Sequence, residues 1–398
     1  MLLTMLLAAA LAAMVALAGL AQRAEAASPE TIVFVSARTT GKGVNNPTGD
    51  AEIFRMNPNG TGLRQLTFNE VFDSRPLLSP DGQKILYSSQ GAQPSNPEGD
   101  QELYLMNATD GSAQKNLTNN AGIVNEGHPE FSPDGRKIAY MSEGEQEGNP
   151  QSDREVYVMN ASDGSGKKNL SDNGEFVEDY APSFSPDGQK VAYTSYGAQT
   201  SNPEGDAEVY VANAADGSGK QNLSDNGYFN WDQSPSFSPD GQKIFYSSDG
   251  EQASNPEGES EVYVMNASNG TKKKNLTNNG LDAYDSLFYA QVTPDGQKLL
   301  YTSQGAQASN PEGDQELYLM NASDGSGKKN LSNNGGGVDE FYGVYSPDGQ
   351  KLLYQSDGVQ TSNPEGESEV YMMNAADGSA KKNLTNNNVR DFYPEWGR

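Results

Sequence analysis

Apolar and polar residues follow a four-part pattern that recurs along the chain, and residues 182–224 illustrate it. PSFSPDGQKVAYTS predicts two short strands around a turn, because Ser-Pro-Asp-Gly places each residue where a type I turn prefers it. EVYVAN, the turn Ala215-Asp216-Gly217-Ser218 and KQNLS predict two more strands. Each unit is therefore expected to contain four antiparallel strands, called A to D in chain order.

The unit has a nearly constant length. Ser-Pro-Asp-Gly begins at 79, 132, 185, 238 and 346, and Thr-Pro-Asp-Gly at 293, so successive turns are 53, 53, 53, 55 and 53 residues apart. A period of this size indicates a solenoid or a propeller. Strands B and C are apolar at almost every position, which is typical of a sheet covered on both faces, whereas strand D starts with lysines, as a solvated edge does. Four-stranded sheets packed face to face in a ring form a β-propeller.

The ends of the chain determine the number of blades. The strand C phrase occurs seven times, from EIFRMN at 52 to EVYMMN at 369, but only six Pro-Asp-Gly turns accompany it. DFYPEWGR at 391–398 resembles the missing strand A. We therefore predict an all-β, seven-bladed β-propeller of four-stranded antiparallel blades, closed by the C-terminal strand joining the N-terminal blade.

The repeat also resembles a known family. FSPDGRKIAY at 131 followed by EVYVMNASDGSG at 155 is similar to the TolB-like propeller repeat, a relative of the WD repeats that lacks their Trp-Asp ending. The resemblance covers about residues 30–398. It implies an exported bacterial propeller that serves as a protein-binding scaffold or as an accessory domain of peptidases. The family's namesake resembles a six-bladed ring preceded by a small α/β domain, so its role with peptidoglycan-associated lipoprotein is not carried over.

The first residues and the composition indicate export. Residues 2–20 are almost wholly apolar and precede Ala24-Glu25-Ala26, which predicts a signal peptide over 1–26. The remaining residues 27–398 are expected to form a single propeller domain. The mature protein is then expected in the periplasm or outside the cell. An uncleaved membrane anchor is the alternative. A net charge of -27 makes nucleic acid and anionic membranes poor partners and leaves cations, basic proteins and neutral glycans. The chain has no cysteine, which excludes disulfides and thiolate chemistry. We expect the protein to be a monomer.

The D-to-A connections are the predicted ligand-binding region. With this strand order, the A-to-B and C-to-D turns share one face of the ring, and the longer B-to-C and D-to-A loops share the other. The D-to-A loops differ between units that are otherwise nearly copies, and they are rich in aromatic residues that suit contacts with protein, peptide or sugar. Packing between blades is the alternative role. The predicted ligand-binding residues are Phe72, Phe176, Tyr180, Phe229, Trp231, Tyr284, Tyr289, Phe341, Tyr342, Phe392 and Tyr393.

Acidic residues form two further candidate sites. One acid per unit is predicted at the channel mouth, either as a cation or basic-peptide site or, as its repetition favours, as a structural strut. The B-to-C loop alternates oxygen-bearing side chains as calcium loops do, but without EF-hand spacing. The channel-mouth acids are Asp73, Glu126, Asp179, Asp232, Asp285, Glu340 and Asp391, and the candidate calcium ligands are Asn202, Glu204, Asp206 and Glu208.

Catalysis has little support in the sequence. His128 is the only histidine, which argues against a Ser-His-Asp triad or a multi-histidine metal site, and we expect it in a D-to-A loop as a surface contact. The favoured function is a noncatalytic exported scaffold that binds a protein, peptide or glycan through the face with the D-to-A and B-to-C loops. The alternatives are a carboxylate- and calcium-dependent hydrolase or lyase at the channel mouth, and an ion-stabilised structural envelope protein.

Overall fold

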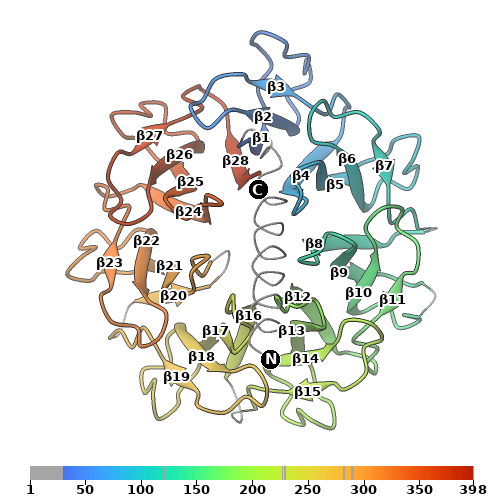
Figure 1. Cartoon of the computed structure of the whole chain (residues 1–398), viewed down its shortest axis with the longest axis vertical. Helices are drawn as coiled ribbons and strands as arrows, with labels where there is room; N and C mark the ends of the chain where they lie inside the picture. The colour runs from blue at the N-terminus through green and yellow to red at the C-terminus, as the bar shows by residue number, and fades with distance from the viewer. Residues whose placement is uncertain are drawn as a thin grey trace, which may run out of the picture.

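The strands of the chain form a closed ring of small sheets (Figure 1). The computed structural model describes residues 30–397 except 121, 147, 226, 228–229, 281–282 and 288–290, so the predicted signal peptide lies outside the described residues. Seven sheets of four antiparallel strands are present, which confirms the predicted seven-bladed propeller. Blade 1 is β28-β1-β2-β3, and blades 2 to 7 follow in chain order from β4–β7 to β24–β27.

The A and B strands are the inner two strands of each blade. The A strands are β4 (Phe72–Leu78), β8 (Asn125–Phe131), β12 (Glu178–Phe184), β16 (Trp231–Phe237), β20 (Tyr284–Ser286), β24 (Asp339–Tyr345) and β28 (Asp391–Trp396). They surround the central channel in Figure 1. The B strands are β1 (Ile32–Ser36), β5 (Lys84–Gln90), β9 (Lys137–Glu143), β13 (Lys190–Tyr196), β17 (Lys243–Asp249), β21 (Lys298–Gln304) and β25 (Lys351–Asp357).

The outer two strands of each blade differ greatly in length. The C strands are β2 (Glu52–Met56), β6 (Gln101–Asn107), β10 (Arg154–Asn160), β14 (Ala207–Asn213), β18 (Glu261–Asn266), β22 (Glu316–Asn321) and β26 (Glu369–Asn374). The D strands contain only two residues each and lie at the rim: β3 (Arg64–Gln65), β7 (Lys115–Asn116), β11 (Lys168–Asn169), β15 (Gln221–Asn222), β19 (Lys274–Asn275), β23 (Lys329–Asn330) and β27 (Lys382–Asn383) (Figure 1).

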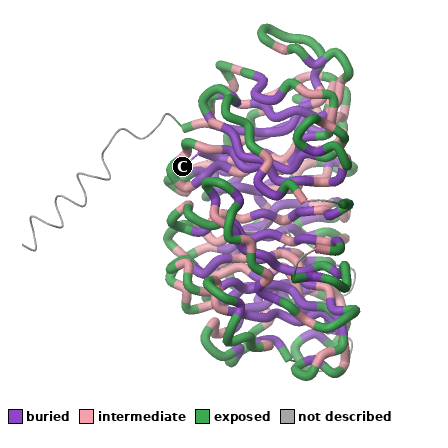
Figure 2. The backbone as a smooth tube through the Cα atoms, turned by 90° about the vertical axis from the view of Figure 1, so that its right-hand side faces the viewer, coloured by how far each residue is buried: buried purple, intermediate pink, exposed green. Residues whose placement is uncertain are grey.

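The hydrophobic core lies between neighbouring blades. Strands B and C are buried on both faces, as their continuous apolar runs predict, and facing sheets share one cluster of side chains, such as Ile53 of blade 1 with Ile85 and Met106 of blade 2. Figure 2 shows this buried layer between two largely exposed faces. Each blade therefore depends on its neighbours for burial of its apolar surface.

The ring closes between strands from opposite ends of the chain. β1 pairs antiparallel with β28, with Ile32 opposite Trp396 and Ser36 opposite Asp391. The Arg38 Nη2 atom lies 2.8 Å from Asp391 Oδ2, and Trp396 Nε1 donates to the Val344 carbonyl at 3.1 Å, which ties the closing strand to blade 7. The predicted closure by the C-terminal strand is thus confirmed.

Glycines in the C-to-D turns allow neighbouring blades to approach closely. Gly270 of blade 5 has φ +66°, and a Cβ atom there would lie 2.0 Å from the Leu223 carbonyl oxygen of blade 4. We expect Gly270→Ala to lower the free energy of unfolding by about 2–5 kcal/mol, since it combines backbone strain with overpacking. Denaturant unfolding should show this loss, while Gly174→Ala, with no atom within 4 Å of the added carbon, should change stability by less than about 0.5 kcal/mol. Equal losses in both variants would contradict the close-approach argument.

Candidate functional site: a docking face and a central channel

The exposed apolar side chains gather on one face of the ring. Within the described residues, every exposed large hydrophobic side chain lies in a D-to-A or B-to-C loop, or at the end of a strand that adjoins one. We call the face with these loops the docking face. The exposed residues are Phe68, Phe72, Ile123, Phe176, Tyr196, Trp231, Tyr284 and Val359.

Four exposed aromatic residues of this face belong to blades 4 to 6. Trp231 begins β16 and stacks on Tyr196, the last residue of β13, with ring centroids 5.1 Å apart. Phe176 is 84% exposed, and its carbonyl lies against Gly197, the neighbour of Tyr196. Tyr284 begins β20 at the position equivalent to Trp231. We call these four residues the aromatic arc.

Charge is distributed unequally between the two faces. Apart from Lys42, every lysine lies at the first residue of a B strand or within two residues of the start of a D strand, on the opposite face or the rim. The docking face instead carries exposed glutamates, and its arginines Arg154 and Arg390 pair with glutamates of the same face. The exposed glutamates of this face are Glu70, Glu98, Glu145, Glu175, Glu251, Glu257, Glu312 and Glu365.

The predicted ligand-binding aromatics do not all occupy the docking face in the same way. Phe72, Phe176, Trp231 and Tyr284 are exposed there, whereas Tyr180, Phe341 and Phe392 are only partly exposed. Tyr342 and Tyr393 line the central channel instead. Phe229 and Tyr289 lie outside the described residues.

The predicted channel-mouth acids are buried between blades. Asp73, Glu126, Asp179, Asp232, Asp285, Glu340 and Asp391 each have no exposed surface, and none of them lines the channel cavity. At the interface of blades 3 and 4, Ser171 Oγ donates to Glu155 at the start of β10, and the Asn173 backbone N–H donates to the same carboxylate at 3.1 Å. The Asn173 side-chain amide donates to Asp179. Two carboxyl groups thus share one buried network.

Burial shifts the protonation of these paired carboxyls. Loss of hydration raises the pKa of Glu155 to about 8, with the nearby Asp179 charge as the second cause, and burial raises the pKa of Asp179 to about 6. Burial likewise raises the pKa of Glu52 to about 9 and of Asp73 to about 6. A neutral carboxyl in each pair removes the repulsion that two buried anions would suffer.

The candidate calcium loop uses its oxygens in local hydrogen bonds. Asn202 Nδ2 donates to the Asp206 carbonyl at 2.7 Å, while Asn202 Oδ1 accepts from Gly205 N–H at 3.1 Å. Asp206 Oδ2 accepts from the Asn230 backbone N–H of blade 5 at 3.3 Å, and Glu208 accepts from Ser224 Oγ. Glu204 is half-buried at the loop surface. Within the described part of the chain, no three His, Asp or Glu side chains are grouped to hold a metal ion.

A β-bulge directs one residue of six of the seven A strands, all except β20, into the channel. The pairing register between strands A and B changes at the same point in each of these blades, for example between Tyr180 and Ser183 in blade 4. The residue at this point, Ala181 in blade 4, has φ near +50° although it is not glycine. Such a bulge turns a side chain away from the regular alternation of the strand. The bulge residues are Arg75, His128, Ala181, Ser234, Tyr342 and Tyr393, with φ of 50, 48, 51, 56, 51 and 52°.

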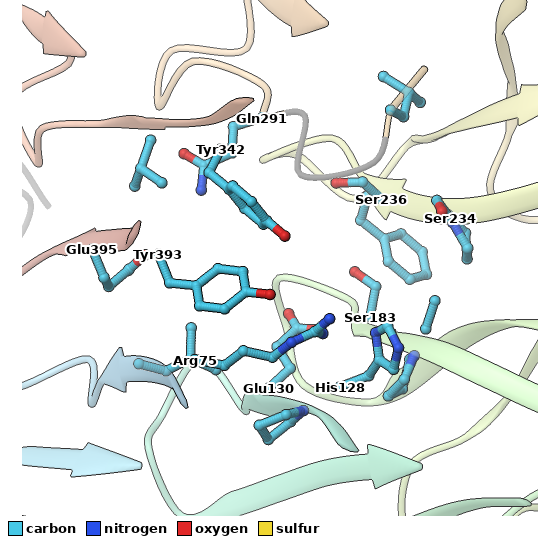
Figure 3. Close-up of a pocket in the computed structure, with 18 of the residues that line it drawn as sticks. Arg75, His128, Glu130, Ser183, Ser234, Ser236, Gln291, Tyr342, Tyr393 and Glu395 are labelled. Atoms are coloured by element: carbon cyan, nitrogen blue, oxygen red, sulfur yellow. The ribbon is translucent and has the colours of Figure 1, made fainter. Parts of the chain in front are cut away.

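These residues line a cavity of about 500 Å³ in the channel. Figure 3 shows the labelled side chains of Arg75, His128, Tyr342 and Tyr393 directed into the same space. The Arg75 guanidinium carbon lies 5.5 Å from the Tyr393 ring centroid, and the Tyr393 and Tyr342 rings meet edge to face at 4.7 Å. The expected loop position of His128 is wrong, because His128 lies on β8, where the bulge turns it into the channel.

His128 is uncharged at neutral pH. Burial lowers its pKa to about 4, helped by the positive charges of Arg75 and Arg154. The imidazole is therefore neutral at pH 7 and offers one donor and one acceptor nitrogen. Its strand position was missed because a bulge breaks the alternation from which side-chain direction is read.

Comparison with known proteins agrees with the fold. Residues 173–310 match the family model described as TolB beta propeller domain. A Protein TolB homolog of Chlorobium chlorochromatii (strain CaD3) is 30% identical over 135 residues, covering 25% of this chain and 30% of the relative, so the match spans less than a third of that relative.

Two solved structures share the architecture at low sequence identity. TolB from Acinetobacter baumannii is 16% identical with a TM-score of 0.50, covering 93% of this chain and 83% of that chain. Oligogalacturonate lyase from Vibrio parahaemolyticus is 13% identical with a TM-score of 0.56, covering 83% of this chain and 81% of that chain. At these identities the similarity concerns the fold alone. In the described residues, no helix is long and apolar enough to cross a membrane.

Proposed function

Because the chain is a TolB-like β-propeller, we propose that it is a noncatalytic scaffold in the bacterial cell envelope that binds a basic protein through its docking face. The observation that carries this proposal is the confinement of the exposed large apolar side chains to one face. Scattered apolar side chains are normal on a protein surface, but a one-sided distribution is typical of an interaction site. A periplasmic location is part of the proposal.

The charge of the docking face selects the class of partner. Exposed glutamates share the docking face with the aromatic arc, while every lysine except Lys42 lies on the opposite face or the rim. Complementary charge speeds encounter and excludes wrong partners, and aromatic side chains at the centre of an interface supply most of the binding energy. A protein with a basic surface and apolar pockets therefore fits this face best.

A hydrolase or lyase at the channel mouth is less well supported. The seven predicted channel-mouth acids are fully buried and outside the cavity, and several are hydrogen-bonded to asparagine side chains, so no carboxylate of this set faces a space that could hold substrate.

The test uses the aromatic arc directly. We expect Trp231→Ala and Phe176→Ala each to weaken binding of the partner about 10- to 30-fold, because each removes an exposed aromatic anchor. The partner is first captured from a cell-envelope fraction, then purified, and its dissociation constant is measured with each variant by calorimetry.

The matched control lies on the opposite face. Lys190→Ala, at the start of β13, should leave the dissociation constant unchanged, while raising the salt concentration should weaken binding to the wild-type protein. A captured partner that is acidic, or that binds the arc variants as tightly as the wild type, would overturn the proposal.

A further inference from the structure

The bulge positions vary while their surroundings repeat. The bulge residue lies two positions after a buried acid in blades 1 to 5 and 7, and a proline follows it in blades 1 to 5. Across these blades the bulge residue itself is tyrosine, arginine, histidine, alanine or serine. A non-glycine residue in the left-handed region is strained, so the surrounding structure must stabilise a conformation that presents these side chains to the channel.

The variation makes the channel asymmetric. Blades 7, 1, 2 and 3 are consecutive around the ring and contribute the long polar side chains of Tyr342, Tyr393, Arg75 and His128. Blades 4 and 5 contribute only Ala181 and Ser234 at the same position. At the bulge positions, the cavity of about 500 Å³ thus has large hydrogen-bonding groups on one side and small residues on the other, where Phe237 and Leu287 also line it. Its volume is in the range of small-molecule sites.

The lining has little net charge, unlike the rest of the protein. Arg75, Glu130 and Glu395 are its only charged residues at neutral pH, in a chain of net charge -27. Serine and glutamine side chains, represented by Ser183, Ser236 and Gln291, add neutral donors and acceptors. A strongly charged ligand therefore finds no net opposite charge here, whereas an uncharged ligand with many hydroxyl groups finds both donors and acceptors.

We propose that the channel cavity binds a small neutral sugar, up to the size of a disaccharide, against the wall formed by Tyr342, Tyr393, Arg75 and His128. Arginine offers several hydrogen-bond donors, and glutamate offers acceptors, to the hydroxyl groups of a sugar ring. Tyrosine offers an apolar ring and a hydroxyl group to the same ligand. The site is separate from the docking face, because the aromatic arc does not line the cavity.

The bulge residues of other blades suggest which substitution the backbone at Ser234 can accept. Tyr342 and Tyr393 adopt φ of 51° and 52°, close to the 56° of Ser234, so the backbone at Ser234 is suited to a tyrosine. Ser234→Tyr should fill the side of the cavity opposite Tyr342 and Tyr393, and it should weaken sugar binding at least about tenfold. Saturation-transfer NMR with trehalose, maltose, cellobiose and di-N-acetylchitobiose on the wild-type protein identifies the sugar that binds, and calorimetry then measures its dissociation constant for each variant.

A second variant covers the case in which Ser234→Tyr fails to fold. Tyr393→Phe keeps the ring and removes only the hydroxyl group, and it should weaken binding about threefold to tenfold. Phe176→Ala should bind the sugar normally while binding the protein partner about 10- to 30-fold more weakly, so failure of either proposal can be recognised separately. Absence of binding by all four sugars, stronger binding of citrate or spermidine, or unchanged binding in Ser234→Tyr would each overturn the inference.

Discussion

A chain that stops after Arg390 is expected to lose more than about 5 kcal/mol of its free energy of unfolding, because the missing residues include the whole of β28. Without β28, the edge of β1 becomes unpaired, and the facing apolar surfaces of blades 7 and 1 are partly exposed. Trp396 alone is 2% exposed, and Trp396→Ala should account for about 3–5 kcal/mol of the loss.

The buried ion pair of the closure gives a finer test. Arg38→Met leaves Asp391, which has no exposed surface, without its guanidinium partner, and should cost about 3–5 kcal/mol at pH 7. Adding Asp391→Asn should recover part of this loss, because the uncompensated charge disappears.

Denaturant unfolding measures each closure variant. The control is Arg136→Ala, which removes an exposed ion pair with an N···O distance of 3.9 Å and should change stability by less than about 0.5 kcal/mol. Near-wild-type stability of the truncated chain would show that the other six blades do not depend on closure.

The second large effect is a loss of stability as the pH rises from about 5 to 9. The folded protein holds the pKa of Glu155 at about 8 and of Glu52 at about 9, both above the usual value near 4.5, because their sites are poorly hydrated and face a second acid. A raised carboxyl pKa means that the folded state binds the proton more tightly than the unfolded state. The stabilisation that each of these carboxyl groups gives to the folded state is therefore fully present below about pH 4.5. It is lost as the pH rises through the pKa of that group in the folded protein.

Each interface with such a pair should lose on the order of 2 kcal/mol over this range. His128 opposes this trend. Because its pKa is lowered, its contribution to stability rises with pH and is fully present above about pH 6.5, but it is a single group. Thermal unfolding at pH 5, 7 and 9 should give a falling midpoint temperature.

A neutral substitution at one interface isolates the cause. Glu155→Gln cannot ionise, and it should reduce the loss between pH 5 and 9 relative to the wild type. Glu312→Gln, at an exposed position, should leave the pH dependence as it is. If Glu155→Gln shows the full wild-type loss, the buried pair is not its source.

The sequence was sufficient to predict the fold, because several local signals agreed. Ser-Pro-Asp-Gly turns, apolar B and C strands and the fragment at 391–398 together predicted seven blades and their closure. The D strands proved shorter than KQNLS suggested, with only Gln221 and Asn222 paired in blade 4.

The functional regions were only partly predictable. The loops of the docking face could be recognised from their variation, and Trp231 and Phe176 are exposed there. Tyr342, Tyr393 and His128 could not be assigned to the channel, since a bulge reverses side-chain direction without a distinctive sequence. A non-glycine residue before proline in five neighbouring units would have been the available signal, but such a residue also fits an ordinary strand.

The pairing of β28 with β1 also bears on the order in which the protein folds during its synthesis. The ribosome makes β1, β2 and β3 first among the described strands and β28 last, so blade 1 waits as a three-stranded sheet while the other six blades appear. During this interval, the side of β1 that will receive β28 offers a free row of backbone donors and acceptors. A chaperone that covers this edge during translation would protect the nascent protein from pairing with another chain there.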